Sequence, residues 1–309
     1  MVLTTCTIQY LMNNIIVRIA LQPKKYLAKL LLKFAFCLSD KQYLKALFML
    51  RFGYSLDLKN PKTFCEKLQW LKLYDRKPEY ARMVDKYEVK KYVADKIGNE
   101  YIIPTLGVWD APEDIEWEEL PNQFVLKTTH GGGGNGVIVC KDKTKLDIKA
   151  VCKQLHKSLS SDLYKTFREW PYKNVSKRII AESFLASPSG ELKDYKFFCF
   201  NGKVKCFKID FGRFVEHHAN YYSPEGELLP FGEKGLEPDP NHIEIMPENL
   251  NEMISLAEQL SDGFKFLRVD LYNIKGKIYF GELTFYPAAG LGELVPGEWN
   301  EKIGGFINI

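Results

Sequence analysis

The chain has 309 residues, of which 46% are hydrophobic and 27% are charged, a composition that supports a large folded core and excludes disordered and fibrous proteins. Its 43 basic and 39 acidic residues leave a net charge of +4, too small an excess for a dedicated nucleic-acid-binding protein. The seven cysteines stand singly, without a CxxC pair or metal-ligand spacing. We therefore expect free thiols in a reducing cytosol and no nucleic-acid partner.

The first fifty residues are apolar but repeatedly interrupted by lysine and arginine. No run is long enough to span a bilayer, and no secretory signal precedes it, so we expect a cytoplasmic protein. Over residues 26–38, leucine and phenylalanine recur at helical spacing beside Lys25, Lys29 and Lys33. This pattern favours a helix packed on the main domain, and it also fits peripheral contact of residues 15–50 with the inner face of an anionic membrane.

Helices are predicted for most of the first hundred residues. Thr63 and Glu66 have the spacing of a capping box ahead of apolar residues at helical intervals. A second helix is expected over residues 79–97, with Gly98 as its C-terminal cap.

Short strand-like runs follow in the second third of the chain. Their residue ranges are 101–103, 124–128, 137–140 and 178–184. Asn201-Gly202, between apolar runs at 197–200 and 203–207, is typical of a tight hairpin because both residues accept positive φ. A helix over 247–260 then leads to a last hairpin over 266–285, and the whole order predicts an α+β protein.

A loop with five glycines lies between two strand-like runs in the segment from Phe124 to Val139. Consecutive glycines let backbone N–H groups approach an anion closely, and Lys127 just before the loop would place an ammonium group beside phosphates. The spacing fits neither common nucleotide loop, because the chain returns as a strand. A flexible hairpin tip is the alternative, but such tips need only two residues, so we interpret the loop as a phosphate flap.

The last hairpin carries a second group of polar residues. If it turns about Gly276, Asp270 lies opposite Glu282 and Arg268 opposite Thr284, with all four on one face. Opposed Cβ atoms are about 5 Å apart, a distance at which two carboxylates repel unless a cation lies between them. Mg²⁺ takes one or two protein carboxylates, so this pair is a candidate metal site. Taken alone, a solvated charged face is an equally good interpretation.

Two further acidic positions are less specific. Glu182 comes near the end of the run 178–184, and Asp194 lies two residues before Lys196. In isolation, each fits an ordinary surface charge or a same-face ion pair equally well.

Taken in order, these segments resemble the ATP-grasp superfamily. From about Asn60 to the C-terminus they are similar to its TupA-like branch, which is associated with teichuronopeptide and other surface-polysaccharide clusters. The resemblance implies an ATP-grasp fold, in which antiparallel sheets with flanking helices hold a nucleotide between two subdomains. The expected regions are a helical N-terminal region at 1–58, an N-terminal subdomain at 59–120, a lid at 121–185 and a large subdomain at 186–309.

The resemblance also implies ATP and Mg²⁺ as cofactors and a role for each candidate residue. Glu182 would hold the adenine amine, with an apolar shelf beside it. The implied nucleotide-binding residues are Lys86, Lys127, His130, Gly132, Gly133, Gly134, Glu182, Phe184 and Leu185. The implied catalytic residues are Arg268, Lys196 and Asp194, and the implied metal contacts are Asp270, Glu282 and Thr284, where Thr284 replaces the asparagine of many members.

The implied reaction joins a carboxylate to an amine through an acyl phosphate, in bacterial surface-polysaccharide biosynthesis. The substrates would be small molecules or glycan-linked groups. A sugar kinase could use the same phosphate site, whereas a glycosyltransferase or a non-catalytic partner would not need it. Two features depart from the family pattern: the N-terminal region lacks an α/β domain, and the segment 286–292 has fewer glycines than expected.

Overall fold

The computed structural model describes residues 23–132, 134, 136–186, 192–212, 217–236, 238–242 and 244–309. Its strands are β1 (Thr105–Trp109), β2 (Phe124–Thr128), β3 (Ile138–Cys140), β4 (Ile179–Ser183), β5 (Asp194–Phe200), β6 (Lys203–Phe211), β7 (His218–Tyr222), β8 (Gly232–Glu233), β9 (Phe266–Ile274), β10 (Lys277–Thr284) and β11 (Leu294–Val295). They form a four-stranded sheet of order β1-β4-β2-β3, a five-stranded sheet of order β10-β9-β5-β6-β7, and a β11-β8 pair. Every pairing is antiparallel, which confirms the predicted α+β class.

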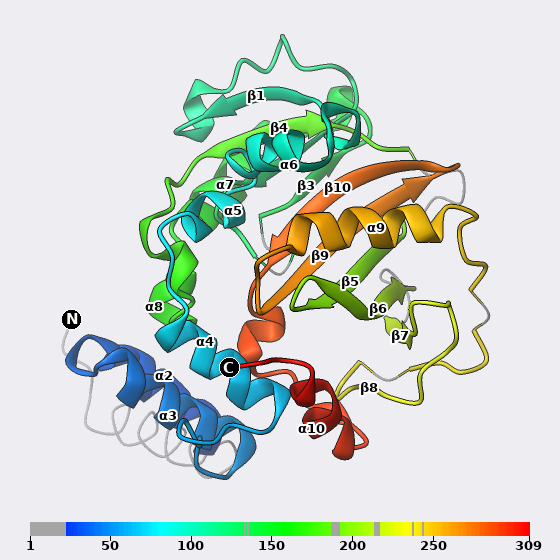
Figure 1. Ribbon diagram of the computed structural model, residues 1–309. Coiled ribbons are helices and arrows are strands. Elements are labelled where there is room, and N and C mark those ends of the chain that lie inside the picture. The colour runs from blue at the N-terminus through cyan, green and yellow to red at the C-terminus, as the bar shows by residue number, and fades with distance from the viewer. Residues whose placement is uncertain are drawn as a thin grey trace, which may run out of the picture.

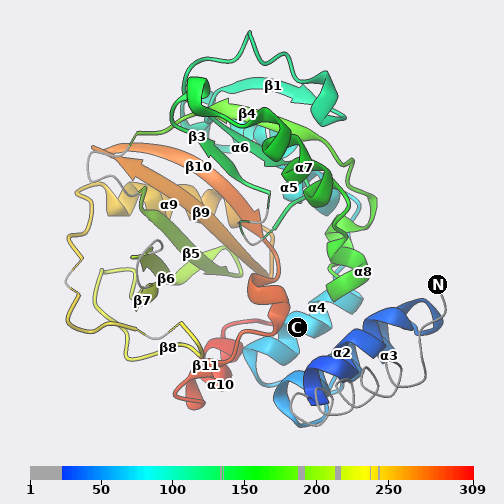
Figure 2. The same cartoon turned by 180° about the vertical axis from the view of Figure 1, so that it is seen from behind.

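Helices surround the two larger sheets. They are α2 (Pro23–Lys33), α3 (Asp40–Phe52), α4 (Phe64–Tyr74), α5 (Tyr80–Val84), α6 (Val89–Ile97), α7 (Ile148–Leu159), α8 (Leu163–Phe167), α9 (Leu250–Ser261) and α10 (Glu298–Gly305). Figures 1 and 2 show the four-stranded sheet at one end of the molecule and α2 and α3 at the other, beyond α4. Within the described ranges, no helix has the length and apolarity needed to cross a bilayer.

The N-terminal helices begin at local capping signals. The predicted box at Thr63 and Glu66 is present at the start of α4, and a second box joins Ser39 and Gln42 at the start of α3. The helical run expected over 26–38 is shorter than predicted, because α2 ends at Lys33 and a 3₁₀ turn follows.

The single helix predicted over 79–97 is wrong. The chain forms α5 and α6 instead, separated by a turn at residues 85–88. Asp85 Oδ1 accepts hydrogen bonds from the backbone N–H groups of Tyr87 and Glu88, a local arrangement that competes with helix. The N–H of Lys86 donates to the carbonyl of Thr129, 2.9 Å away, which requires a partner distant in sequence.

The strand predicted at 101–103 is also wrong. A 3₁₀ helix at Asn99–Tyr101 occupies its start, and β1 begins only at Thr105, after Pro104. The strands predicted at 124–128, 137–140 and 178–184 correspond to β2, β3 and β4.

The predicted hairpin between β5 and β6 is confirmed. Its turn residues, Asn201 and Gly202, have φ angles of 50° and 75°, as a tight turn of this type requires. The helix predicted over 247–260 is α9, which packs against β5, β6 and β9.

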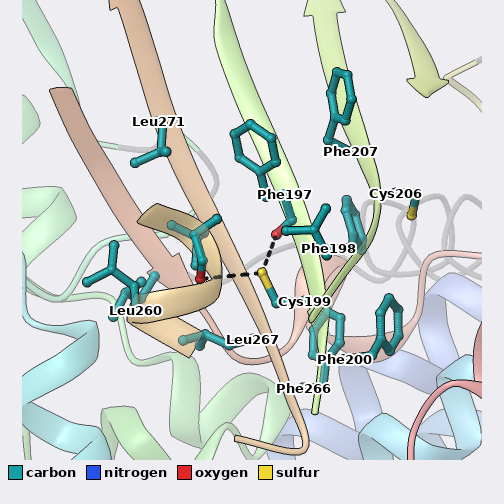
Figure 3. Packing of buried hydrophobic residues seen from close by; sticks show 14 of the residues in the cluster. Phe197, Phe198, Cys199, Phe200, Cys206, Phe207, Leu260, Phe266, Leu267 and Leu271 are labelled. Atoms are coloured by element: carbon teal, nitrogen blue, oxygen red, sulfur yellow. Dashed lines mark hydrogen bonds between the residues drawn. The ribbon is translucent and has the colours of Figure 1, made fainter. Parts of the chain in front are cut away.

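The main core lies on both faces of the five-stranded sheet, under α9 on one face and against α4 on the other. Figure 3 shows Phe197, Leu260 and Leu271 in this core. The Cys199 thiol donates to the carbonyls of Phe197 and Ala257, each 3.7 Å away, and burial raises its pKa to about 12. No disulfide occurs among the described cysteines, which are free thiols as expected. The polar residues Arg268 and Asp270 share their face of β9 with Phe266, which is part of this core.

Candidate active site

Asp270 on β9 and Glu282 on β10 lie beside each other on the polar face of the last hairpin. The Arg268 guanidinium bridges them: its Nε and Nη2 donate to the two Asp270 oxygens at 2.7 Å each, and Nη2 also donates to Glu282 Oε1 at 3.0 Å. One cationic group therefore reaches both carboxylates. The two carboxylates thus lie close enough to share a cationic partner, and Mg²⁺, which takes one or two protein carboxylates, fits such a pair.

The predicted pairing of Asp270 with Glu282 and of Arg268 with Thr284 is confirmed. The cause of this pairing differs from the one expected. The hairpin pairs Ile274 with Lys277, so its turn is not centred on Gly276, and a bulge between Phe280 and Glu282 then shifts the register by one residue. Without that bulge, the register would place Glu282 opposite Val269, on the apolar face. The extra residue in β10 is Gly281, where a Cβ would lie 3.0 Å from the Asp270 carbonyl oxygen.

The two carboxyl groups have pKa values shifted in opposite directions. Burial raises the pKa of Asp270 to about 7, despite the nearby charges of Arg268 and Lys196. Burial would also raise the pKa of Glu282, but Lys86 and Arg268 outweigh it and lower that pKa to about 2. Two acidic groups that share a site commonly separate in this way.

The third predicted metal contact, Thr284, lies at the edge of the pair. Its hydroxyl is 3.4 Å from Glu282 Oε1, at the limit of a hydrogen bond. Among the described residues, no group of three or more His, Cys, Asp or Glu side chains could hold a metal. A two-carboxylate site still fits Mg²⁺, which fills its other positions with phosphate oxygens and water.

The predicted residues Asp194 and Lys196 lie on β5, next to the carboxylate pair. Lys196 Nζ contacts Asp194, lies 3.1 Å from Asp210 and lies 3.8 Å from Asp270. Burial disfavours its charge, but these three carboxylates together raise the pKa of Lys196. Sequence reasoning missed Asp210. The alternating Lys208 and Asp210 on the adjacent strand would have been the available signal.

Lys86 joins the glycine loop to the carboxylate pair. Its Nζ donates to the Gly131 carbonyl at 2.5 Å and lies 3.7 Å from Glu282 Oε2. Tyr172, which sequence reasoning also missed, lines a small cavity with Lys86 and Glu282. The structure therefore brings the first predicted phosphate lysine to the predicted metal ligands.

Lys127 lies on β2 and pairs with Glu182 on β4. Its Nζ is 2.6 Å from Glu182 Oε2, while Lys90 Nζ is 2.7 Å from Glu182 Oε1. Burial alone would raise the pKa of Glu182, but these two lysines lower it. Lys90 was not predicted from the sequence, although it lies only four residues after Lys86. The other expected adenine contacts, Phe184 and Leu185, follow β4 directly and are half-buried.

The glycine loop contains groups that suit an anion. Thr128 Oγ1 and His130 Nδ1 are buried and have no hydrogen-bond partner in the described part of the chain. Burial, with Lys177 and Lys86 nearby, lowers the pKa of His130. The neutral ring has one N–H, on Nδ1 or Nε2 according to the tautomer.

The predicted loop glycines lie in different surroundings. Gly134 has a φ of 74° and open space around it, whereas a Cβ on Gly132 would lie 3.1 Å from Leu163. Gly133 lies outside the described residues. The orphaned polar atoms, together with Lys86 and Lys127, fit the phosphates of a nucleotide.

The chain is similar to known proteins in sequence and in fold. A family model described as TupA-like ATP-grasp matches residues 66–308. A search of curated proteins found no significant match.

Solved structures that resemble this chain include ligases and synthetases. A D-alanine–D-alanine ligase from Helicobacter pylori is 16% identical, with 80% of this chain and 70% of that chain covered and a TM-score of 0.42. An ADP complex of N5-carboxyaminoimidazole ribonucleotide synthetase is 18% identical, with 80% and 57% covered and a TM-score of 0.44. The Bacillus anthracis D-alanine–D-alanine ligase with ATP is 16% identical, with 66% and 54% covered and a TM-score of 0.39. At these values the solved structures assign no activity to this chain.

Proposed function

Because the chain belongs to the TupA-like ATP-grasp family, we propose that it is an ATP-dependent ligase that joins a carboxylate to an amine. The observation that carries the proposal is the Asp270–Glu282 pair, bridged by Arg268 and linked through Lys86 to the glycine loop. A carboxylate pair, a basic cluster and a loop with orphaned polar atoms together suit a metal-bound triphosphate.

Each group has a role in this proposal. Asp270 and Glu282 would hold Mg²⁺, which when bound neutralises charge on the phosphate oxygens. Lys86 and Lys127 would bind the phosphates, and Arg268 would stabilise the charge that develops during transfer. Phosphoryl transfer depends mainly on such positioning and electrostatics, so no protein nucleophile is required.

The reaction we propose has two steps. A substrate carboxylate oxygen attacks the γ-phosphorus, the bond to the β-phosphate oxygen breaks, and ADP leaves with the electron pair. The amine nitrogen then attacks the carbonyl carbon of the acyl phosphate, inorganic phosphate leaves, and the nitrogen loses a proton. Direct attack on a carboxylate would have to expel oxide, a poor leaving group. The glycine loop would exclude water, which would otherwise hydrolyse the intermediate.

The pathway we propose is bacterial surface-polysaccharide biosynthesis, on the cytoplasmic side. The support is the family resemblance. Suitable substrates are a uronic acid or amino-acid carboxylate and an amino-acid or amino-sugar amine, free or glycan-linked.

The test is release of ADP from ATP and Mg²⁺ with carboxylate–amine pairs from the organism's own polysaccharide. Wild-type protein should release ADP, and hydroxylamine should trap a hydroxamate. Asp270→Asn should lower turnover at least 100-fold, as removal of a group that stabilises transferred charge does. ADP release without a hydroxamate would point to a hydroxyl acceptor and therefore to a sugar kinase. Failure to bind ATP at all would overturn the proposal.

We also propose that residues 15–50 contact an anionic membrane surface. In the described part of this segment, α2 has lysines and no acidic residue. Its neighbourhood exposes apolar side chains: Leu27 is 49% exposed, Leu30 52%, Phe34 48% and Phe36 82%. Exposed apolar residues beside lysines suit insertion at a lipid headgroup layer.

Vesicle co-sedimentation tests this contact. The wild type should bind phosphatidylglycerol vesicles more strongly than phosphatidylcholine vesicles, and Leu30→Ser with Phe34→Ser should lower the bound fraction several-fold. Ile245→Ser removes an apolar side chain of 85% exposure elsewhere and should not. Equal sedimentation with both vesicle types would contradict the proposal.

A further inference from the structure

Lys90 on α6 is a buried lysine whose ammonium group has three protein acceptors. Its Nζ lies 2.7 Å from Glu182 Oε1, 2.7 Å from Thr105 Oγ1 and 2.8 Å from the Ile103 carbonyl oxygen. The side chain is 13% exposed. An ammonium has three donors, so these contacts use its full capacity and leave none for a ligand.

Lys127 differs from Lys90 in this respect. Glu182 is its one hydrogen-bond partner among the described residues, at 2.6 Å, so donors remain for another group. Lys90 and Lys127 thus share one buried carboxylate, with one oxygen each. The three groups together carry a surplus positive charge, which a simple Lys127–Glu182 pair would not have. Phosphate is attracted to that surplus.

The elements that carry these residues belong to different parts of the fold. Glu182 and Lys127 lie on β4 and β2 of the four-stranded sheet. Helix α6 packs instead beside α9 on the five-stranded sheet, where the Tyr92 hydroxyl donates to the Leu260 carbonyl at 2.8 Å. Lys90 therefore links α6 to the four-stranded sheet.

We propose that Lys90 is a positioning residue of the nucleotide site, which acts through Glu182 to hold Lys127 free for phosphate. This inference rests on the proposed function. Lys90 itself would not touch the nucleotide.

The experiment is a double-mutant cycle on ATP binding, measured by calorimetry with Mg²⁺ and without any acceptor. Lys90→Met should weaken binding about tenfold, and Lys127→Met at least as much. In the Lys127→Met background, Lys90→Met should have little further effect, because its route to the phosphates is gone. A merely structural lysine would produce the same loss in both backgrounds.

Matched variants complete the test. Lys91→Met removes the neighbouring lysine, whose side chain is 69% exposed and pairs with Asp95, and should bind ATP as the wild type does. Lys90→Arg should recover most of the affinity. If Lys90→Met does not fold, Thr105→Val removes one of its acceptors more gently and should weaken binding about threefold.

The outcomes separate two failures. If the wild type does not bind ATP, the proposed function fails. If the wild type binds and Lys90→Met binds equally well, or if the two losses simply add, only the role of Lys90 is overturned.

Discussion

Lys72 on α4 is fully buried, and its position shows how a single charge can organise neighbouring loops. Its Nζ donates to the carbonyls of Phe167 and Ala289, at 2.9 and 2.7 Å. Burial lowers the pKa of Lys72 to about 8, while the nearby Glu169 opposes that change. Lys72 thus ties α4 to the segment before β4 and to the loop after β10, the strand that carries Glu282.

Replacing Lys72 by methionine should lower the free energy of unfolding by about 3 kcal/mol, because the carbonyls of Phe167 and Ala289 lose the Lys72 donor and the buried Glu169 loses the positive charge that opposes its protonation. Urea denaturation measures this. Lys302→Met, which breaks an exposed pair with Glu298, serves as the control and should change stability by less than about 0.5 kcal/mol. Equal effects of the two changes would contradict this account of Lys72.

ATP binding in the presence of Mg²⁺ should depend on pH through Asp270. A metal ligand must be ionised, and burial raises the pKa of Asp270 to about 7. Affinity should therefore rise with pH up to about 7 and then level off. Below that value, protonation of Asp270 competes with the metal, and affinity should fall up to tenfold per pH unit.

Calorimetric titrations of ATP binding from about pH 5.5 to 8.5 would check this pH dependence. The range extends roughly 1.5 units to either side of the pKa of Asp270. Glu282 should contribute no change over that range, because its pKa lies near 2. A flat profile for the wild type would show that Asp270 is already ionised throughout.

At the scale of elements, the β9–β10 hairpin depends on its bulge. Insertion of one alanine between Gly281 and Glu282 would shift the ladder by one residue beyond the bulge and turn Glu282 to the apolar face opposite Val269. The insertion should abolish Mg²⁺-dependent ATP binding. Gly276→Ala at the hairpin turn, where φ is 84°, should cost about 1 kcal/mol of stability and leave the binding intact.

Calorimetry and urea denaturation on both variants would test the bulge. Binding that survives the insertion would contradict this account of how Asp270 and Glu282 meet.

The loop after β10 contains a second local departure from regular structure. Ala288 and Ala289 both have positive φ, 47° and 55°, and Gln69 and Lys72 hold the loop through its carbonyls. A left-handed alanine costs roughly 1 kcal/mol. Ala289→Gly should accordingly leave stability unchanged or raise it by up to about 1 kcal/mol, measured by thermal unfolding. A clear loss would show that the methyl group packs usefully.

At the scale of the whole molecule, Asp40 joins the N-terminal helices to the segment between α7 and β4. Arg76 Nη2 lies 2.7 Å from it, Arg168 Nε 3.1 Å and the Tyr164 hydroxyl 3.1 Å. Arg168 is buried and also donates to the Ala35 carbonyl at 2.6 Å. The helices near the N-terminus are thus attached to the rest of the molecule by a partly buried ion network.

Asp40→Ala should lower the free energy of unfolding by about 3 kcal/mol, because it leaves Arg168 buried without its carboxylate. Asp95→Ala, which breaks the exposed pair with Lys91, should have almost no effect. Urea denaturation with limited proteolysis would show whether the N-terminal helices detach. If Asp40→Ala is as stable as Asp95→Ala, the helices are held by apolar packing alone.

The sequence by itself determined the features whose causes are local. The capping box at Thr63 and Glu66, the turn at Asn201-Gly202 and the glycine loop each depend on a few adjacent residues, and the order of the motifs sufficed to identify the family.

The tertiary structure alone decided the features that need distant partners. The break between α5 and α6 is held by Thr129, and Lys90 meets Glu182 across 92 positions of the chain, counted from their numbers. The bulge at Gly281 set which face Glu282 occupies, a choice that the hairpin turn alone would have made differently. The sequence specifies which acidic and basic side chains are present. Their burial and their distances from one another are set only when the two sheets pack, because they depend on contacts between segments far apart in the chain.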